Sequence, residues 1–216
     1  MKNNSTHITL VVDRSGSMST TKNDAEGGIR TFVDEQKKVD GDCSFLLYEF
    51  DTQVDKVFGP GNLQDFPNNY QLNPRGSTAL LDAMGMAIVT TGEYLASLSE
   101  DQRPDKVIFL TVTDGEENSS HEYTSTKIRE LVTEQETKFN WSFMFIGSSL
   151  MAIEQARQFG INSYIGTEST PAANRALYQN LASQTKGMRT NTQDVFMSAK
   201  ISGSGALSST PNLKKR

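Results

Sequence analysis

The chain has 216 residues and a formal net charge of −5. This acidic balance lacks the overall positive charge typical of nucleic-acid-binding domains, so we expect no nucleic-acid partner. Because Cys43 is the only cysteine, an intramolecular disulfide and a cysteine-rich zinc site are excluded. No apolar segment approaches the ~20 residues of a membrane span, and the first residues do not resemble a signal peptide. We therefore expect a cytoplasmic protein without membrane attachment.

Short apolar runs alternate with helical patterns along the chain. The runs at 8–12, 43–50 and 106–113 are apolar at most positions, which is typical of buried parallel strands. Segment 53–58 follows the second run after only two residues, which predicts an antiparallel hairpin strand at an edge of the sheet. Further strands are expected at 141–147 and 163–165, and helices at 24–38, 78–95, 125–139, 153–159 and 170–185.

This order of elements predicts an α/β fold with helices on both faces of a mostly parallel sheet and one antiparallel edge strand. Gly, Pro and Asn recur between residues 59 and 74, so we expect a surface connection there, with a short helical turn near 63–66. After Arg189 the composition changes to Ser, Gly, Thr and Lys. We therefore predict one domain over residues 1–190 and a flexible, basic C-terminal tail over residues 191–216.

The first strand ends in Asp13, Ser15 and Ser17, which alternate with Arg14 and Gly16. Three short oxygen-bearing side chains from one tight turn can converge on a hard cation such as Mg²⁺, Mn²⁺ or Ca²⁺. Alternatively, they form a helix N-cap cluster, in which a serine hydroxyl satisfies free amide groups of the next helix. On this segment alone both interpretations stay open.

Two later segments lead to the same edge of the predicted sheet. Thr78 precedes a helix, and Asp114 ends the buried strand 106–113. Because the carboxyl ends of parallel strands meet at one edge, we expect Asp13, Thr78 and Asp114 to face one crevice. Two carboxylates would balance a divalent cation, while neutral hydroxyls would leave it able to accept one more anionic ligand.

Together, Asp13-x-Ser15-x-Ser17, Thr78 within Gly-Ser-Thr-Ala-Leu and Asp114 within Thr-Asp-Gly-Glu resemble the metal-ion-dependent adhesion site of the von Willebrand factor type A domain family. The resemblance covers roughly residues 6–185. It implies a Rossmann-like three-layer αβα sandwich, and a divalent cation held by those five residues, Mg²⁺ first and Mn²⁺ or Ca²⁺ as alternatives.

The same resemblance implies a partner protein whose Asp or Glu side chain completes the metal shell. It also implies that the last helix, about residues 170–185, can move when the metal coordination changes. Members of this family inside cells often serve large assemblies. We therefore expect an adaptor or assembly domain that binds other proteins, and not an enzyme.

The main enzymatic alternative is a metal-dependent phosphotransferase, because Asp13 after a strand resembles the nucleophile of haloacid-dehalogenase-like phosphatases. Those enzymes place a second acid two residues further on, where this chain has Ser15, and no suitably placed lysine is evident.

Residues around the predicted site offer little for other chemistry. His7 and His121 are the only histidines, which leaves little material for a catalytic triad. We expect His7 to be an edge residue at the start of the first strand, and His121 to lie on a solvated loop after Asp114. Arg14 and the pair Glu116-Glu117 are expected at the rim of the site, where they would contact a partner.

Overall fold

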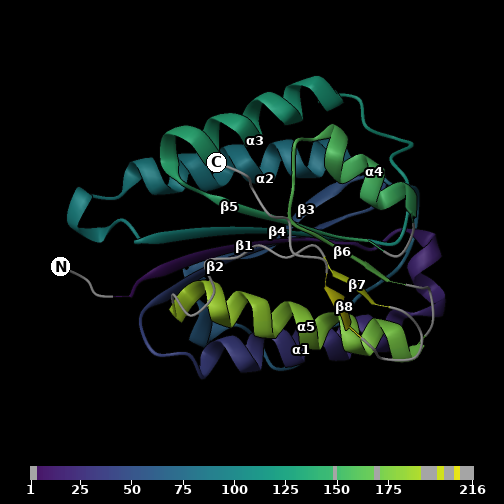
Figure 1. Ribbon diagram of the computed structural model, residues 1–216, viewed down its shortest axis with the longest axis horizontal. Helices are drawn as coiled ribbons and strands as arrows, with labels where there is room; N and C mark the ends of the chain where they lie inside the picture. The colour runs from purple at the N-terminus through teal and green to yellow at the C-terminus, as the bar shows by residue number, and fades with distance from the viewer. Residues whose placement is uncertain (1–3, 148–149, 168–170, 191–198, 202–206, 210–216) are drawn as a thin grey trace.

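A central sheet lies between two layers of helices in the computed structural model (Figure 1). The structure describes residues 4–147, 150–167, 171–190, 199–201 and 207–209. Within these residues the strands are β1 (Thr6–Asp13), β2 (Cys43–Phe50), β3 (Val54–Asn62), β4 (Lys106–Thr113), β5 (Ser142–Gly147), β6 (Tyr164–Thr167), β7 (Ala199–Ile201) and β8 (Leu207–Ser209).

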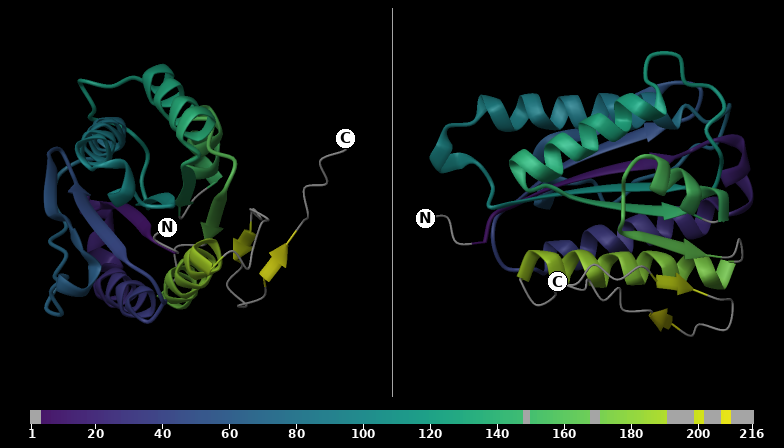
Figure 2. Two further views of the ribbon diagram at one scale, coloured as in Figure 1. Left: turned by 90° about the vertical axis from the view of Figure 1, so that its left-hand side faces the viewer. Right: turned by 45° about the horizontal axis from the view of Figure 1, so that its top comes forward.

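The helices of the described residues are α1 (Lys22–Lys37), α2 (Leu80–Ser97), α3 (Ser125–Phe139), α4 (Leu150–Gln158) and α5 (Pro171–Thr190). α1 and α5 cover one face of the sheet, and α2, α3 and α4 cover the other (Figures 1 and 2). Short 3-10 helices occur at η1 (Gly16–Thr20), η2 (Leu63–Asp65) and η3 (Glu100–Gln102). The arrangement is the predicted three-layer αβα sandwich.

The strand order is β3-β2-β1-β4-β5-β6-β7-β8. Strands β2, β1, β4, β5 and β6 pair in parallel, and β3 pairs antiparallel with β2 at the edge. This confirms the predicted fold class. Beyond β6, the short strand β7 continues the sheet in parallel and β8 pairs antiparallel with β7. The predicted boundary of the domain at residue 190 stays a prediction.

Apolar side chains of alternate strand positions form two cores, one on each face of the sheet. On β1, Ile8, Leu10 and Val12 pack in the core that includes α1 and α5. Val11 faces the opposite core, which includes α2 and α3. Because β1 is buried on both faces, the polar residues His7 and Thr9 on its second face are buried as well, and they hydrogen-bond to each other.

Several predicted boundaries need correction. The expected surface connection from residue 59 is in fact strand up to Asn62, so that Gly59 and Pro60 lie within β3. An edge strand tolerates this proline, since its missing N–H need not serve the sheet. The last helix continues to Thr190, five residues further than expected. The predicted helical turn near 63–66 is confirmed as η2.

His7 does not lie at an edge, because β1 is flanked by β2 and β4. Its side chain is fully buried. The ring nitrogens lie 2.7 Å from Ser44 Oγ and 3.0 Å from Thr9 Oγ1, and the ring packs against Tyr94 of α2. His7 is therefore a buried, hydrogen-bonded residue of a central strand.

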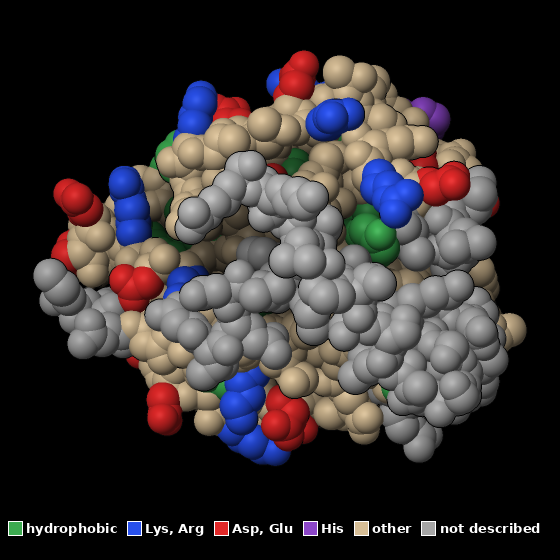
Figure 3. Space-filling view, viewed as in Figure 1, with side chains coloured by type: hydrophobic (Ala, Val, Ile, Leu, Met, Phe, Trp, Pro, Cys, Tyr) green, Lys and Arg blue, Asp and Glu red, His purple; other side chains and the backbone are tan. Residues whose placement is uncertain are grey.

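Charged side chains lie mainly at the surface. Over the part of the face in Figure 3 that the structure describes, acidic and basic side chains are interspersed. Ion pairs such as Lys138–Glu134 and Lys127–Glu130 on α3 belong to this pattern. Within the described residues, no helix combines the length and the apolar character that crossing a membrane requires.

Candidate metal centre

The turn after β1 directs its side-chain oxygens toward one another. The Asp13 carboxylate accepts a hydrogen bond from the backbone N–H of Ser15 at 2.6 Å. Ser15 occupies the N-cap position of η1, but its side chain makes no capping hydrogen bond. Instead, its Oγ lies 2.9 Å from Ser17 Oγ. The alternative of a helix N-cap cluster is therefore not supported, because the Ser15 hydroxyl contacts another side chain and not a free amide group of the helix.

The end of β4 joins this turn because β1 and β4 pair in parallel and end at the same edge. Ser17 Oγ donates to Asp114 Oδ1 at 2.6 Å. Thr113 Oγ1 donates to Asp13 Oδ2, also at 2.6 Å. Each carboxylate is thus tied to the segment that carries the other one.

Thr78 approaches the same point from the loop before α2. A Cβ atom placed on Gly115 would lie 3.3 Å from Thr78 Oγ1, 3.7 Å from Asp13 Oδ2 and 3.8 Å from Ser17 Oγ. Oxygens from three segments therefore lie within 4 Å of one point beside Gly115. Thr78 is buried.

The loop that follows β4 holds Thr78 in place. Thr78 N–H donates to Asn118 Oδ1 at 2.9 Å, and Asn118 N–H donates to the Thr78 carbonyl at 3.1 Å. The Glu117 carboxylate accepts from the N–H of Leu81 in the first turn of α2 at 2.9 Å. Sequence reasoning missed Thr113 and Asn118 as supporting residues. Their proximity to Asp114 was the only signal, and it does not reveal a contact with Asp13 or Thr78.

Burial dominates the electrostatics of the two carboxylates. Desolvation raises the pKa of Asp13 to about 6, against the opposing effect of hydrogen bonds from Thr113 and Ser15. Desolvation also raises the pKa of Asp114, while its hydrogen bond from Ser17 acts in the opposite direction. Water therefore contributes little to stabilising the negative charges of the two carboxyl groups in this site.

Arg14 is not at the rim of the site, contrary to expectation. It is 7% exposed and forms ion pairs with Glu49 of β2 at 3.2 Å, with Asp51 at 2.8 Å and with Asp55 of β3. Arg75 pairs with the same Asp51 oxygen from the solvent side. Arg14 therefore balances charge beside the site and is not available to a partner.

The expected rim residues after Asp114 divide into two groups. Glu117 is engaged with α2 and with the backbone N–H groups of Ser119 and Ser120, so its role is structural. Glu116 and His121 are exposed, as expected of a solvated loop.

The donor set fits a hard divalent cation. Carboxylate and hydroxyl oxygens are the ligands that Mg²⁺ and Ca²⁺ accept. Within the described residues, no group of three or more His, Cys, Asp or Glu side chains is placed to hold a metal ion. A cation beside Gly115 would therefore depend on the hydroxyls of Ser15, Ser17 and Thr78 together with the two carboxylates.

No protein-family model matches the chain, and neither does any curated protein. Solved structures do match. A von Willebrand factor type A protein from Catenulispora acidiphila aligns with a TM-score of 0.63 and 12% identity, over 85% of this chain and 43% of that one. The chain thus spans less than half the length of that protein.

Two further matches come from pili. The von Willebrand factor domain of the type V pili tip protein Mfa5 from Porphyromonas gingivalis aligns with a TM-score of 0.57 and 12% identity, over 88% of this chain and 97% of that one. The pilus adhesin SpaC from Lactobacillus rhamnosus GG aligns with a TM-score of 0.57 and 15% identity, over 87% of this chain and 31% of that one. This chain therefore has the von Willebrand factor type A fold, and at these identities the likeness concerns the fold alone.

Proposed function

We propose that this domain binds a partner protein through a divalent cation, with Mg²⁺ as the first candidate. The cation would be held by Asp13, Ser15, Ser17, Thr78 and Asp114, and a carboxylate of the partner would complete its shell. The observation that carries the proposal is that Thr78 Oγ1, Asp13 Oδ2 and Ser17 Oγ all lie within 4 Å of one point beside Gly115.

Each residue has a distinct part in this proposal. Asp13 and Asp114 supply the negative charge, and Ser15, Ser17 and Thr78 supply neutral oxygens. When bound, the cation supplies a positive charge that accepts an external carboxylate oxygen. Thr113 orients Asp13 through its 2.6 Å hydrogen bond.

The functions named for two proteins of the same fold also support a role in protein interaction. Two of the solved neighbours are a pilus adhesin and a pilus tip protein. The phosphotransferase alternative is disfavoured, since Ser15 stands where the second acid is required and its hydroxyl faces Ser17. An adaptor or assembly role, a cytoplasmic location and a movable last helix stay predictions.

Isothermal titration calorimetry with Mg²⁺, Mn²⁺ and Ca²⁺ tests the metal site. We expect Ser17→Ala to weaken binding at least about 10-fold and Asp13→Asn to abolish it. Ser19→Ala is the matched control, because Ser19 lies in the same 3-10 helix and is exposed. Unchanged affinity in both Ser17→Ala and Asp13→Asn would exclude the proposed ligands.

Water-proton relaxation of the Mn²⁺-loaded protein tests the open coordination position. Acetate, as the simplest carboxylate, should displace bound water and lower the relaxation enhancement in a saturable way. Methanol at equal concentration serves as the uncharged control. A relaxation enhancement that acetate leaves unchanged would contradict carboxylate capture while leaving the metal site itself intact.

A further inference from the structure

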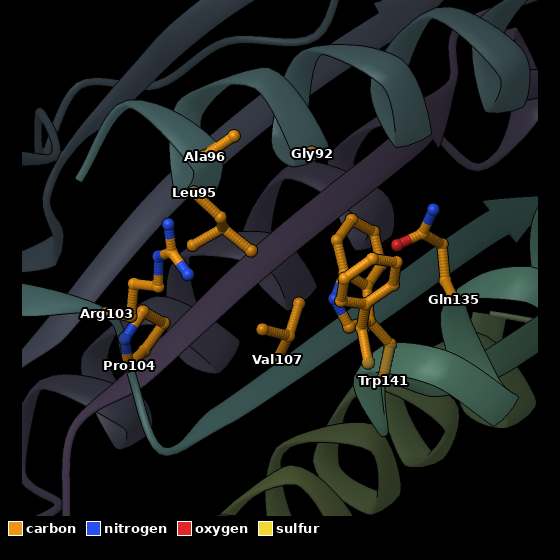
Figure 4. A pocket seen from close by; sticks show the side chains of 9 residues that line it. Gly92, Leu95, Ala96, Arg103, Pro104, Val107, Gln135 and Trp141 are labelled. Carbon is orange, nitrogen blue, oxygen red and sulfur yellow. The ribbon is translucent and has the colours of Figure 1, made fainter. Parts of the chain in front are cut away.

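A second concave site lies at the opposite end of β4. A cleft of about 350 Å³ opens between α2 and α3 above the start of this strand (Figure 4). Val107 in its floor and Thr113 at the candidate metal centre are six positions apart along β4, about 20 Å of strand. The cleft is lined by Gly92, Leu95, Ala96, Arg103, Pro104, Val107, Gln135, Phe139 and Trp141.

One side of the cleft is aromatic. Trp141 is 6% exposed and stacks on Phe143, with 6.1 Å between ring centroids. Phe139 ends α3 beside it and is 61% exposed, which is unusual for a large apolar side chain. Leu95 and Val107 lie across from these rings (Figure 4). A flat apolar group in the cleft would therefore contact apolar side chains on both sides.

The opposite side carries the only charged side chain in the lining. Arg103 lies next to Leu95 and Pro104, across the cleft from Trp141 (Figure 4). Within the described part of the chain its guanidinium forms no ion pair and no side-chain hydrogen bond, in contrast to Arg14 and Arg75. A guanidinium that no described residue neutralises, at the edge of an apolar cleft, is suited to a carboxylate.

We propose that this cleft binds a small carboxylic acid with an aromatic or apolar body. The body lies between Trp141 and the side chains of Leu95 and Val107, and the carboxylate pairs with Arg103. The volume is within the range of sites for small organic molecules. This inference is independent of the proposed metal site, because the two share no residue.

The fluorescence of Trp141 provides a direct measurement, since it is the only tryptophan in the chain. The probe is 3-phenylpropionate, and 3-phenylpropanol is its uncharged counterpart. We expect saturable changes in emission with 3-phenylpropionate, with a Kd of about 1–5 mM for a ligand of this size. The alcohol should bind about 10-fold more weakly.

Arg103→Gln tests the charge. Because the side chain is exposed, the substitution should leave the fold intact. It should weaken 3-phenylpropionate about 10-fold and leave the affinity for 3-phenylpropanol unchanged. Equal affinities of wild type and variant for the acid would overturn the assignment of Arg103, and no saturable change of emission in wild type would overturn the site.

Gly92→Leu tests the cavity itself. A Cβ on Gly92 meets no atom within 4 Å, so a longer side chain can enter the cleft without a clash at its base. Gly27→Leu on α1 is the matched control, because its Cβ also meets nothing within 4 Å. We expect Gly92→Leu to lose 3-phenylpropionate binding and Gly27→Leu to keep it, with circular dichroism to verify folding. Undiminished binding by folded Gly92→Leu would refute the proposal.

Discussion

The two ends of the sheet hold buried polar groups in opposite ways. At the carboxyl end, Arg14 is surrounded by carboxylates, including those of Glu49 and Asp51, which are themselves buried. At the amino end, Arg189 is 1% exposed and donates to neutral oxygens of Gln36. Charge is balanced by charge at one end and by neutral dipoles at the other. Removing a partner should therefore have different consequences at the two ends.

The largest effect is expected from Arg14→Gln at the carboxyl end. This change leaves Glu49 and Asp51, which are 4% and 2% exposed, without their buried cation. Breaking such a buried pair costs about 3–5 kcal/mol of unfolding free energy. Urea unfolding of wild type and variant measures this loss of unfolding free energy. The control Arg75→Gln, at a side chain 58% exposed that contacts the same Asp51, should cost less than about 1 kcal/mol. Equal losses in the two variants would contradict the comparison.

The next effect concerns pH at the amino end. Desolvation lowers the pKa of His7 to about 3. Below an unfolded-state pKa of about 6.5, only the unfolded state binds this proton, so stability falls as pH decreases from 6.5 toward 3. His7 should therefore lower the unfolding free energy at pH 5 by about 2 kcal/mol relative to pH 7.

The difference between wild type and His7→Gln isolates this contribution from carboxyl groups that titrate in the same range. The difference should change with pH below 6.5 and be constant above it. His121→Gln, at an exposed position, is the matched control and should run parallel to wild type. A pH-independent difference for His7→Gln would show that His7 binds its proton equally well in the folded and unfolded states, which would contradict the lowered pKa.

A smaller effect is expected where α1 meets α5. A Cβ on Gly28 would lie 2.2 Å from the ring of Tyr178, whereas a Cβ on the adjacent Gly27 meets nothing within 4 Å. Gly28→Ala should therefore destabilise the protein by about 1–2 kcal/mol through overpacking. Gly27→Ala should stabilise it by up to about 1 kcal/mol through helix propensity. Thermal unfolding of both variants measures the difference, and a shift of the same sign in both would argue against this packing.

The smallest effect is expected from Arg189→Met. Two of the three guanidinium nitrogens, Nε and Nη2, have no hydrogen-bond partner among the residues that the structure describes. The Gln36 carbonyl also accepts from Val39 N–H. An apolar side chain of similar length should therefore change the unfolding free energy by no more than about 1 kcal/mol. A loss as large as that of Arg14→Gln, measured by urea unfolding, would show that Arg189 has an anionic partner.

The sequence predicts an element well when its pattern of apolar residues is compatible with only one type of secondary structure. The bounds of β4 and α3 agree with the predicted 106–113 and 125–139. The Gly-Pro-Gly segment of β3 was predicted as a connection, because these residues usually end strands. It remains strand because β3 is an edge strand, a property of the sheet and not of the segment.

For the site, the sequence predicts which side-chain oxygens lie close together, but not the surrounding contacts that hold these side chains in position. Asp13 and Asp114 lie at the ends of adjacent parallel strands, as expected from two buried runs. The contacts of Arg14 with three carboxylates could not be predicted, because they depend on the register of β2 and β3 around it. The prediction that His7 is an edge residue was wrong for a related reason. The order of the strands in the sheet differs from their order along the chain, and β1 lies between β2 and β4.

The proposed ligands come from distant parts of the chain, as the hydrogen bond between Ser17 and Asp114 illustrates, with 97 positions between its partners. Contacts of such long sequence separation form slowly during folding. The site cannot exist before β1 and β4 have paired. The rate at which refolding chains acquire Mn²⁺ affinity would therefore report the kinetics of that pairing, separately from the formation of the helices.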